Sequence, residues 1–140
     1  MSTVIRAEIS EKNKYYIDKH RYYELKHFCL QYKHWKKEYA SCNESIIFAA
    51  QLDRLPSSNN VPSDITAKYA LQKIFYSERI KLIEDVARKA DAFLYPYILK
   101  AVTEGLSYTY LKAKLDIPCG RDMYYDRYRK FFWLLSEMRD

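Results

Sequence analysis

Arginine, lysine and tyrosine side chains gather near the end of the sequence, and their chemistry suits contact with nucleic acid. The candidate DNA-binding residues are Lys112, Lys114, Arg121, Tyr125, Arg129 and Lys130. An arginine can donate two hydrogen bonds to the edge of a guanine, whereas lysine and tyrosine reach phosphate oxygens. The residue types therefore predict a surface that binds double-stranded DNA.

The same stretch also carries carboxylates, which oppose binding to phosphate. If Tyr128 marks the buried side of a helix, the opposite side presents Asp122, Asp126, Arg129 and Lys130, with Arg121 and Tyr125 at its margins. Either aspartate would repel phosphate, although each can accept a hydrogen bond from cytosine N4. The alternative interpretation is a helical hairpin whose charged residues form only a solvated face.

Metal binding and catalysis find little support in the sequence. His20, His27 and His34 recur every seven residues, so on one helix they lie about 10.5 Å apart, too far for one zinc ion with bonds of about 2.1 Å. No glycine-rich phosphate loop, GxSxG, HExxH, or HxE with a later CxxC is present. The cysteines form no CxxC pair and are expected as free thiols; they are Cys29, Cys42 and Cys119. We expect a protein that is not an enzyme and has no metal or cofactor.

The charge balance favours a polyanionic partner. The 140 residues include 24 Lys and Arg against 18 Asp and Glu, a net charge of +6. Residues 1–40 hold nine basic and five acidic side chains, residues 107–140 hold seven and five, and residues 41–106 hold eight of each. No stretch approaches the roughly 20 apolar residues of a membrane span, and the N-terminus has no apolar signal segment. We expect a cytoplasmic protein that does not bind membranes.

Apolar residues spaced by three and four predict helices and an all-α fold. A first helix is expected from about Asp18 to Ala40, with an apolar face of Tyr22, Leu25, Phe28, Cys29, Tyr32, Trp35 and Tyr39. The run SCNESIIFAAQLDR adds a short helix, and LPSSNNVPSD is the clearest loop. A long helix follows from about Asp64 to Ala90, with Ser63 or Asp64 as its cap. Its buried side is expected to include Ile65, Tyr69, Leu71, Phe75, Leu82, Ile83, Val86 and Ala90.

The two glycines of the chain punctuate shorter helices. Asp91 opens a turn, and the helix PYILKAVTE begins at Pro96 and ends at Gly105. Ser107 caps the helix YTYLKAKL, which buries Leu111 and Leu115 with Ala113 nearby. DIPCG then breaks the chain before RDMYYDRYRKFFWLLSEM, whose buried face is Tyr124, Tyr128, Phe131, Leu135 and Met138. Both Gly105 and Gly120 are expected to adopt backbone angles that favour glycine.

This order of elements is a helix-turn-helix, whose second helix enters the major groove of DNA. The run GLSYTYLKAKLDIP resembles the fourth conserved region of bacterial sigma factors, with Leu106, Ser107, Leu111, Leu115 and Ile117 matching its pattern. The sequence departs from this pattern at Pro118 and Cys119, which stand where the sigma pattern has its capping serine.

The chain as a whole resembles phage late-gene transcription activators of the RinA/ArpU type. The resemblance is carried by YYELKHFCLQYKHWKKEY, RIKLIEDVARKAD and IPCGRDMYYDRYRKFFWLL, which span most of the sequence. It implies a DNA-binding regulator of phage or prophage origin, for which RNA polymerase is a further expected partner. It implies no catalytic residue.

The first helix is aromatic on more than one side, which favours either self-association or packing within the chain. Tyr and Trp are preferred at interfaces, and a dimer would place two heads on two half-sites. The alternative is that the aromatic residues pack on the long helix. The predicted division is residues 1–62, for assembly, and residues 63–140, which carry the helix-turn-helix head. A small-terminase-like DNA-packaging subunit and a non-enzymatic helical interaction protein remain as alternative functions.

Overall fold

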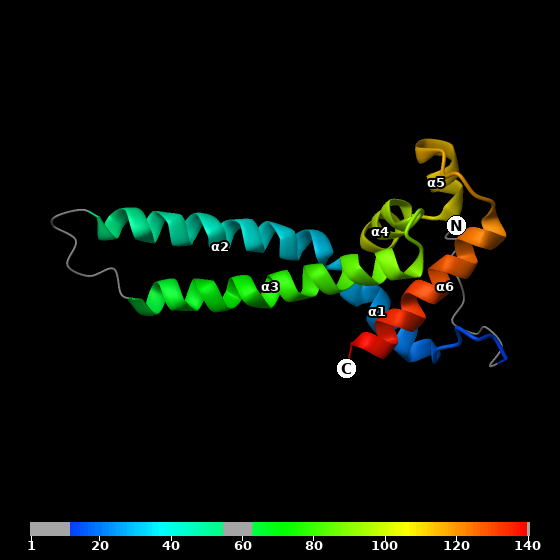
Figure 1. Ribbon diagram of the computed structural model, residues 1–140, viewed down its shortest axis with the longest axis horizontal. Helices are drawn as coiled ribbons and strands as arrows, with labels where there is room; N and C mark the ends of the chain where they lie inside the picture. Colours follow the sequence, from blue (N-terminus) through cyan, green and yellow to red (C-terminus); the bar gives the residue numbers. More distant parts are fainter. Residues whose placement is uncertain (1–11, 55–62, 140) are drawn as a thin grey trace. The chain divides into compact units, whose positions relative to one another are not determined.

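The computed structural model describes residues 12–54 and 63–139, and throughout these residues the regular structure is helical (Figure 1). The helices are α1 (Lys19–Leu30), α2 (Tyr32–Asp53), α3 (Ser63–Ala90), α4 (Tyr95–Glu104), α5 (Tyr108–Leu115) and α6 (Arg121–Met138). The prediction of an all-α fold is confirmed. The loop predicted at LPSSNNVPSD falls largely on residues 55–62, outside the described part of the chain.

The chain forms two compact units, and their boundary differs from the predicted division at residue 62. One unit, called the head below, comprises residues 1–31 and 82–140, and the other, called the hairpin, comprises residues 32–81. α1 belongs to the head because it packs against α4 and α6, which also pack against each other. The hairpin consists of α2 and the first part of α3, which lie side by side (Figure 1).

The helix predicted from Asp18 to Ala40 is in fact two helices, and this prediction was wrong. α1 begins after Asp18, whose carboxylate accepts a hydrogen bond from the His20 N–H at 2.9 Å, and it ends before Gln31. α2 then runs to Asp53 and absorbs the segment expected as a separate short helix. The break has no proline or glycine to mark it, and buried residues continue at helical spacing from Phe28 through Tyr32 to Trp35. Periodicity therefore could not reveal it.

Aromatic residues of α1 complete the core of the head. The Tyr22 ring meets the Phe132 ring edge-on at 5.1 Å between centroids, and the Tyr22 and Tyr128 hydroxyls are hydrogen-bonded at 3.0 Å. Burial raises the pKa of Tyr22 to about 12, so this pair stays protonated at neutral pH. Leu25 and Cys29 are fully buried beside them along the helix. The buried side of α1 therefore serves the chain's own core.

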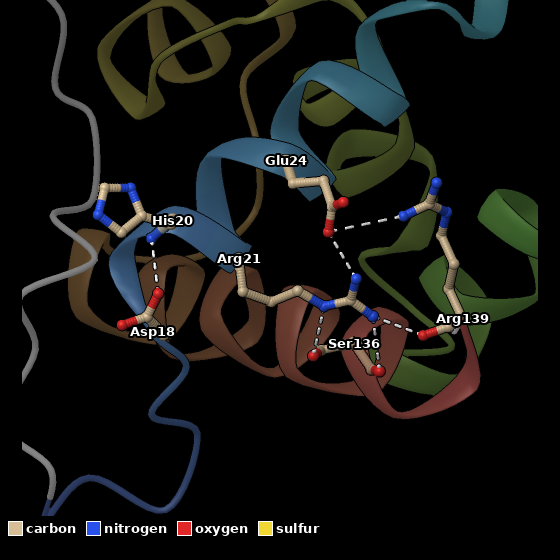
Figure 2. A network of polar contacts seen from close by, with 6 residues as sticks. All are labelled: Asp18, His20, Arg21, Glu24, Ser136 and Arg139. Atoms are coloured by element: carbon tan, nitrogen blue, oxygen red, sulfur yellow. Dashed lines mark hydrogen bonds and ion pairs between the residues drawn. The ribbon is translucent and has the colours of Figure 1, made fainter.

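Polar contacts fasten α1 to the last turn of α6 (Figure 2). The Arg21 guanidinium donates to the Ser136 hydroxyl at 3.1 Å and to the Ser136 carbonyl at 3.2 Å, and it also donates to the Arg139 carbonyl. Glu24 holds the same guanidinium at 2.6 Å. A cation at the C-terminus of a helix satisfies carbonyls that have no partner within the helix and complements the helix dipole. Figure 2 shows the charged group of Arg21 lying directly over this end of α6.

Helix boundaries in the C-terminal part of the head agree with the predictions. α5 covers YTYLKAKL and α6 covers RDMYYDRYRKFFWLLSEM. Gly105 ends α4 in the left-handed region with φ 70°, and the Gly105 and Leu106 N–H groups donate to the Ala101 carbonyl at 2.8 and 3.0 Å. Asp91 opens the preceding turn by accepting hydrogen bonds from the Phe93 and Leu94 N–H groups, both at 2.8 Å.

Other expectations for individual residues were wrong. Gly120 has φ −79°, an extended angle that any residue adopts, so it is not a glycine required by backbone conformation. Leu115 is half-buried and Met138 is exposed, although both were expected to be buried. The predicted buried side of α3 holds only near its end, where Ile83, Val86 and Ala90 are buried. Ile65, Leu71 and Phe75 are exposed because this part of α3 lies in a two-helix unit, which can bury only a narrow stripe of each helix.

We predict that serine at the two glycines will have opposite consequences. Gly105→Ser should lower the free energy of unfolding by about 1 kcal/mol, because an L-residue resists positive φ. Its new Cβ would lie 3.6 Å from a Leu30 methyl, an ordinary contact, so the cost is conformational. Gly120→Ser should be neutral or slightly stabilising, because a Cβ there meets nothing within 4 Å and serine is a preferred N-cap. Denaturant melts of the two variants measure this difference, and equal losses would contradict it.

Candidate nucleic-acid interface

A short helix and a five-residue connection place the start of α6. The Ser107 side chain caps α5 by accepting a hydrogen bond from the Tyr110 N–H at 3.2 Å, as predicted. Asp116 ends α5 in the left-handed region with φ 49°, and the Ile117 N–H donates back to the Leu111 carbonyl at 3.3 Å. Leu111 and Ile117 are both fully buried. The buried Ile117 side chain therefore anchors the connection in the core.

Tyr108 joins the beginnings of α5 and α6. Its hydroxyl donates to the Cys119 carbonyl at 2.7 Å, and its ring lies 5.6 Å from the Tyr124 ring. The Arg121 guanidinium lies over the same Tyr108 ring at 5.1 Å and donates to the Thr109 hydroxyl at 3.3 Å. Arg121 is nevertheless an exposed residue. Its charged group is thus oriented at the surface by two residues of α5.

The first turn of α6 offers backbone N–H groups to a ligand. Gly120 is the N-cap, and among the described residues no side chain makes a capping hydrogen bond to this helix. The first N–H groups of a helix lack partners within it, and together with the helix dipole they attract anions. Arg121 adds positive charge at this point, whereas the exposed Asp122 in the same turn opposes it.

Two of the carboxylates in this region are paired with cations. Asp116 lies 3.8 Å from the Lys112 ammonium, although both groups are well exposed and the pair is weak. Asp126 pairs with Arg127, which also donates through Nε to Asp91 at 2.9 Å. Each pair lessens the repulsion that these carboxylates would exert on phosphate.

Arg127 is a structural residue that the sequence analysis missed. Burial would raise the pKa of Asp91, but hydrogen bonds from the Leu94 N–H, Arg127 and the Phe93 N–H lower it. The hydrogen bond to Asp91 in turn raises the pKa of Arg127. Arg127 therefore links α6 to the start of α4 and is already engaged within the chain. No local pattern could reveal a pair separated by 36 positions.

Arg129 and Lys130 are less exposed than predicted. Both are half-buried, and the Arg129 Nε is buried with no hydrogen-bond partner among the described residues. One helical turn further along α6, the Trp133 ring lies 5.9 Å from the Tyr15 ring at a tilt of 55°. The segment before α1 thus lies against the outer side of α6. The exposed residues of α6 lie at its two ends: Arg121, Asp122 and Met123 in the first turn, and Glu137 and Met138 in the last.

The remaining predicted site residues come from α5 and from the second turn of α6. Lys112 and Lys114 are exposed on α5, and the Lys112 ammonium donates to the Ile117 carbonyl at 3.3 Å. Tyr125 is half-buried, with its ring 6.4 Å from the Tyr108 ring and 5.0 Å from the Tyr124 ring. The structure therefore groups Arg121 and Tyr125 around Tyr108, whereas Arg129 and Lys130 lie further along α6, near Trp133.

The supporting residues Tyr108 and Thr109 were missed because their role depends on the contact between two helices. The sequence signal that could have indicated Tyr108 is its position directly after the Ser107 cap, where a large residue is the first residue of the helix. Thr109 is exposed and carries no comparable signal.

Within residues 12–54 and 63–139 no three His, Cys, Asp or Glu side chains gather as metal ligands, and His20 and His27 lie on a different helix from His34. Cys29, Cys42 and Cys119 are free. In the same residues, no helix combines the length and the apolar character needed to cross a membrane.

Comparison of the chain with protein-family models, curated proteins and solved structures finds no match.

Proposed function

We propose that this protein is a sequence-specific regulator of transcription, of phage or prophage origin, that binds double-stranded DNA through α5 and the first turns of α6. The observation that carries the proposal is the exposed start of α6, where Arg121 is braced on Tyr108 and Thr109 beside a helix N-terminus without a side-chain cap. Helix N-termini and arginines are the groups with which helix-turn-helix proteins contact phosphates and guanines.

The charges of the region support a polyanionic ligand. Lys112, Lys114 and Arg121 are exposed, and two of the neighbouring carboxylates, Asp116 and Asp126, have cationic partners. Asp122 has no such partner among the described residues, and it suits an acceptor for cytosine N4 at one base pair. Arg129 and Lys130 extend the basic surface further along α6.

The resemblance to sigma region 4 and to RinA/ArpU-type activators supports the same assignment. In this proposal RNA polymerase is a protein partner of the DNA-bound regulator, and the regulator acts as a dimer in the cytoplasm. A small-terminase-like packaging subunit would instead assemble into a larger ring, which light scattering distinguishes from a dimer. A helical interaction protein without DNA-binding activity would show no salt-dependent binding to duplexes.

Selection of bound duplexes from a random pool, followed by titrations at several salt concentrations, tests this proposal. We expect a recovered motif, and a slope of log affinity against log salt of about −3.6 to −5.4 for four to six basic contacts. A dimer should recover two half-sites about one helical turn apart. Recovery of no motif, together with affinity that does not depend on salt, would rule out the proposed function.

A further inference from the structure

The segment of residues 12–17, called the arm below, is held in place before α1 begins. The Asn13 side chain accepts a hydrogen bond from the Tyr15 N–H at 2.8 Å, and the Asn13 carbonyl accepts one from the Tyr16 N–H at 3.0 Å. These two hydrogen bonds fold the arm into a tight turn. The Tyr15 ring lies 5.9 Å from the ring of Trp133, in the fourth turn of α6. The arm is therefore folded locally and attached to α6.

Trp133 lies on the side of α6 that faces away from the core of the head. It follows Arg129 by four positions and Asp126 by seven, so these three side chains share one side of the helix. This is the side on which the DNA-binding proposal places contacts of α6. The buried residues on the opposite side are Tyr124, Tyr128, Phe131, Phe132 and Leu135.

The arm meets α6 beyond the part of this helix that is expected to enter the groove. Helix-turn-helix proteins contact base edges with the N-terminal residues of the second helix. Trp133 follows Arg121 by twelve positions, which is about 18 Å along a helix axis. The major groove of DNA is about 12 Å wide. An arm attached at Trp133 would therefore lie over the sugar-phosphate backbone at the edge of the groove.

The exposed side chains of the arm suit contact with that backbone. Lys12 and Lys14 are exposed, and the Lys14 ammonium lies over the Tyr15 ring at 5.0 Å. The carboxylates that flank the arm are Glu11, outside the described residues, and Asp18, which caps α1. Lysines contact phosphate oxygens. A segment that is already ordered loses less conformational entropy when it binds than a disordered one.

We propose that the arm is a second DNA contact, in which Lys12 and Lys14 bind phosphates beside the groove that α6 enters. Tyr15 is the positioning residue that holds the arm on α6. This inference rests on the proposed DNA-binding function, and it extends the contact surface to residues outside α5 and α6.

Replacing Lys12 and Lys14 together with alanine should reduce the slope of log affinity against log salt by about 1.8, because each lost phosphate contact contributes about 0.9. Affinity at about 0.1 M salt should fall roughly 60-fold. The matched control replaces Lys36 and Lys37 of α2 with alanine. Both are exposed, and Lys36 lies over the Tyr32 ring at 5.4 Å. This control should keep the wild-type slope. Fluorescence anisotropy titrations of the full chain with a duplex recovered from the random pool measure both quantities.

Substitutions at Tyr15 distinguish its positioning role from the charge of the lysines. Tyr15→Ala removes the ring contact with Trp133 and keeps both lysines, so affinity should fall roughly threefold to tenfold because the arm must then be ordered on binding. Tyr15→Phe keeps a ring and should bind as the wild type does. Loss of both lysines should cost less affinity in the Tyr15→Ala chain than in the wild type, a coupling that a purely structural role of Tyr15 would not produce.

Circular dichroism of each variant shows whether the helices remain, and the lysine variants carry the test if Tyr15→Ala unfolds. Equal slopes for the arm variant and its control, with a wild-type chain that binds the duplex, would overturn this inference and leave the DNA-binding proposal standing. Tighter binding by the lysine variant or by Tyr15→Ala would also overturn it, because the arm would then cover α6. A wild-type chain without salt-dependent binding would instead refute the DNA-binding proposal, and this inference with it.

Discussion

Replacing Arg121, Arg129 and Lys130 together with alanine is expected to weaken DNA binding by roughly two to three orders of magnitude at about 0.1 M salt. Each cation that contacts a phosphate contributes about 0.9 to the slope of log affinity against log salt, so three lost contacts reduce the slope by about 2.7. Fluorescence anisotropy titrations with a selected duplex at several salt concentrations measure both quantities. The single variants should differ in whether they change affinity alone or also sequence specificity. Lys130→Ala should weaken all sequences alike, whereas Arg121→Ala should also relax specificity at one base pair.

A matched triple variant distinguishes a site from a general loss of charge. Lys68, Lys81 and Arg88 are exposed residues of α3, and their replacement with alanine removes the same charge from outside α5 and α6. We expect this control to bind DNA with nearly the wild-type slope. Equal slopes for the two triple variants, with both chains folded, would show that α6 does not contact the phosphates.

Asp91→Ala is expected to lower the free energy of unfolding by about 3 kcal/mol at neutral pH. The substitution removes the hydrogen bonds to the Phe93 and Leu94 N–H groups and leaves Arg127 without its partner from the start of α4. Loss of a helix-start cap costs about 0.5–2 kcal/mol, and loss of a hydrogen bond to a charged group costs about 1.5–3 kcal/mol. Asp85→Ala is the control, because Asp85 makes only an exposed pair with Arg88 at 3.5 Å and should cost less than about 1 kcal/mol.

The pH dependence of stability gives a second measurement on the same variant. Because the pKa of Asp91 is lowered in the folded chain, its contribution is complete above the unfolded value of about 3.9 and is lost as pH falls through the folded value. The stability difference between the wild type and Asp91→Ala should therefore be constant from about pH 5 to 7 and should shrink below about pH 4. If the stability difference between the wild type and Asp91→Ala stays unchanged in acid, the ionised Asp91 carboxylate is not the form that stabilises the folded chain.

Short-range signals in the sequence determined the C-terminal helices. Three signals each act within a few residues: the proline in the first turn of α4, the left-handed Gly105 at its end and the Ser107 cap of α5. The end of α4 and the start of α5 therefore followed from local chemistry. The buried residues Tyr124, Phe131 and Leu135 were also predicted, because a helix shows its apolar stripe in the spacing of its residues. The sequence also showed the residue types of the candidate DNA-binding surface. The role of this surface stays a prediction, because the comparisons find no match.

Tertiary contacts decided which of these residues are available to a partner. Tyr15 lies against Trp133, Arg129 and Lys130 are half-buried, and Arg127 is engaged by Asp91. Leu71 and Phe75 follow the same spacing rule as Ile83 and Val86, yet the first pair is exposed and the second is buried. Periodicity specifies which side of a helix is apolar, whereas burial requires a second surface against that side. That surface comes from distant parts of the chain, so only the folded structure could show where it exists and where it is missing.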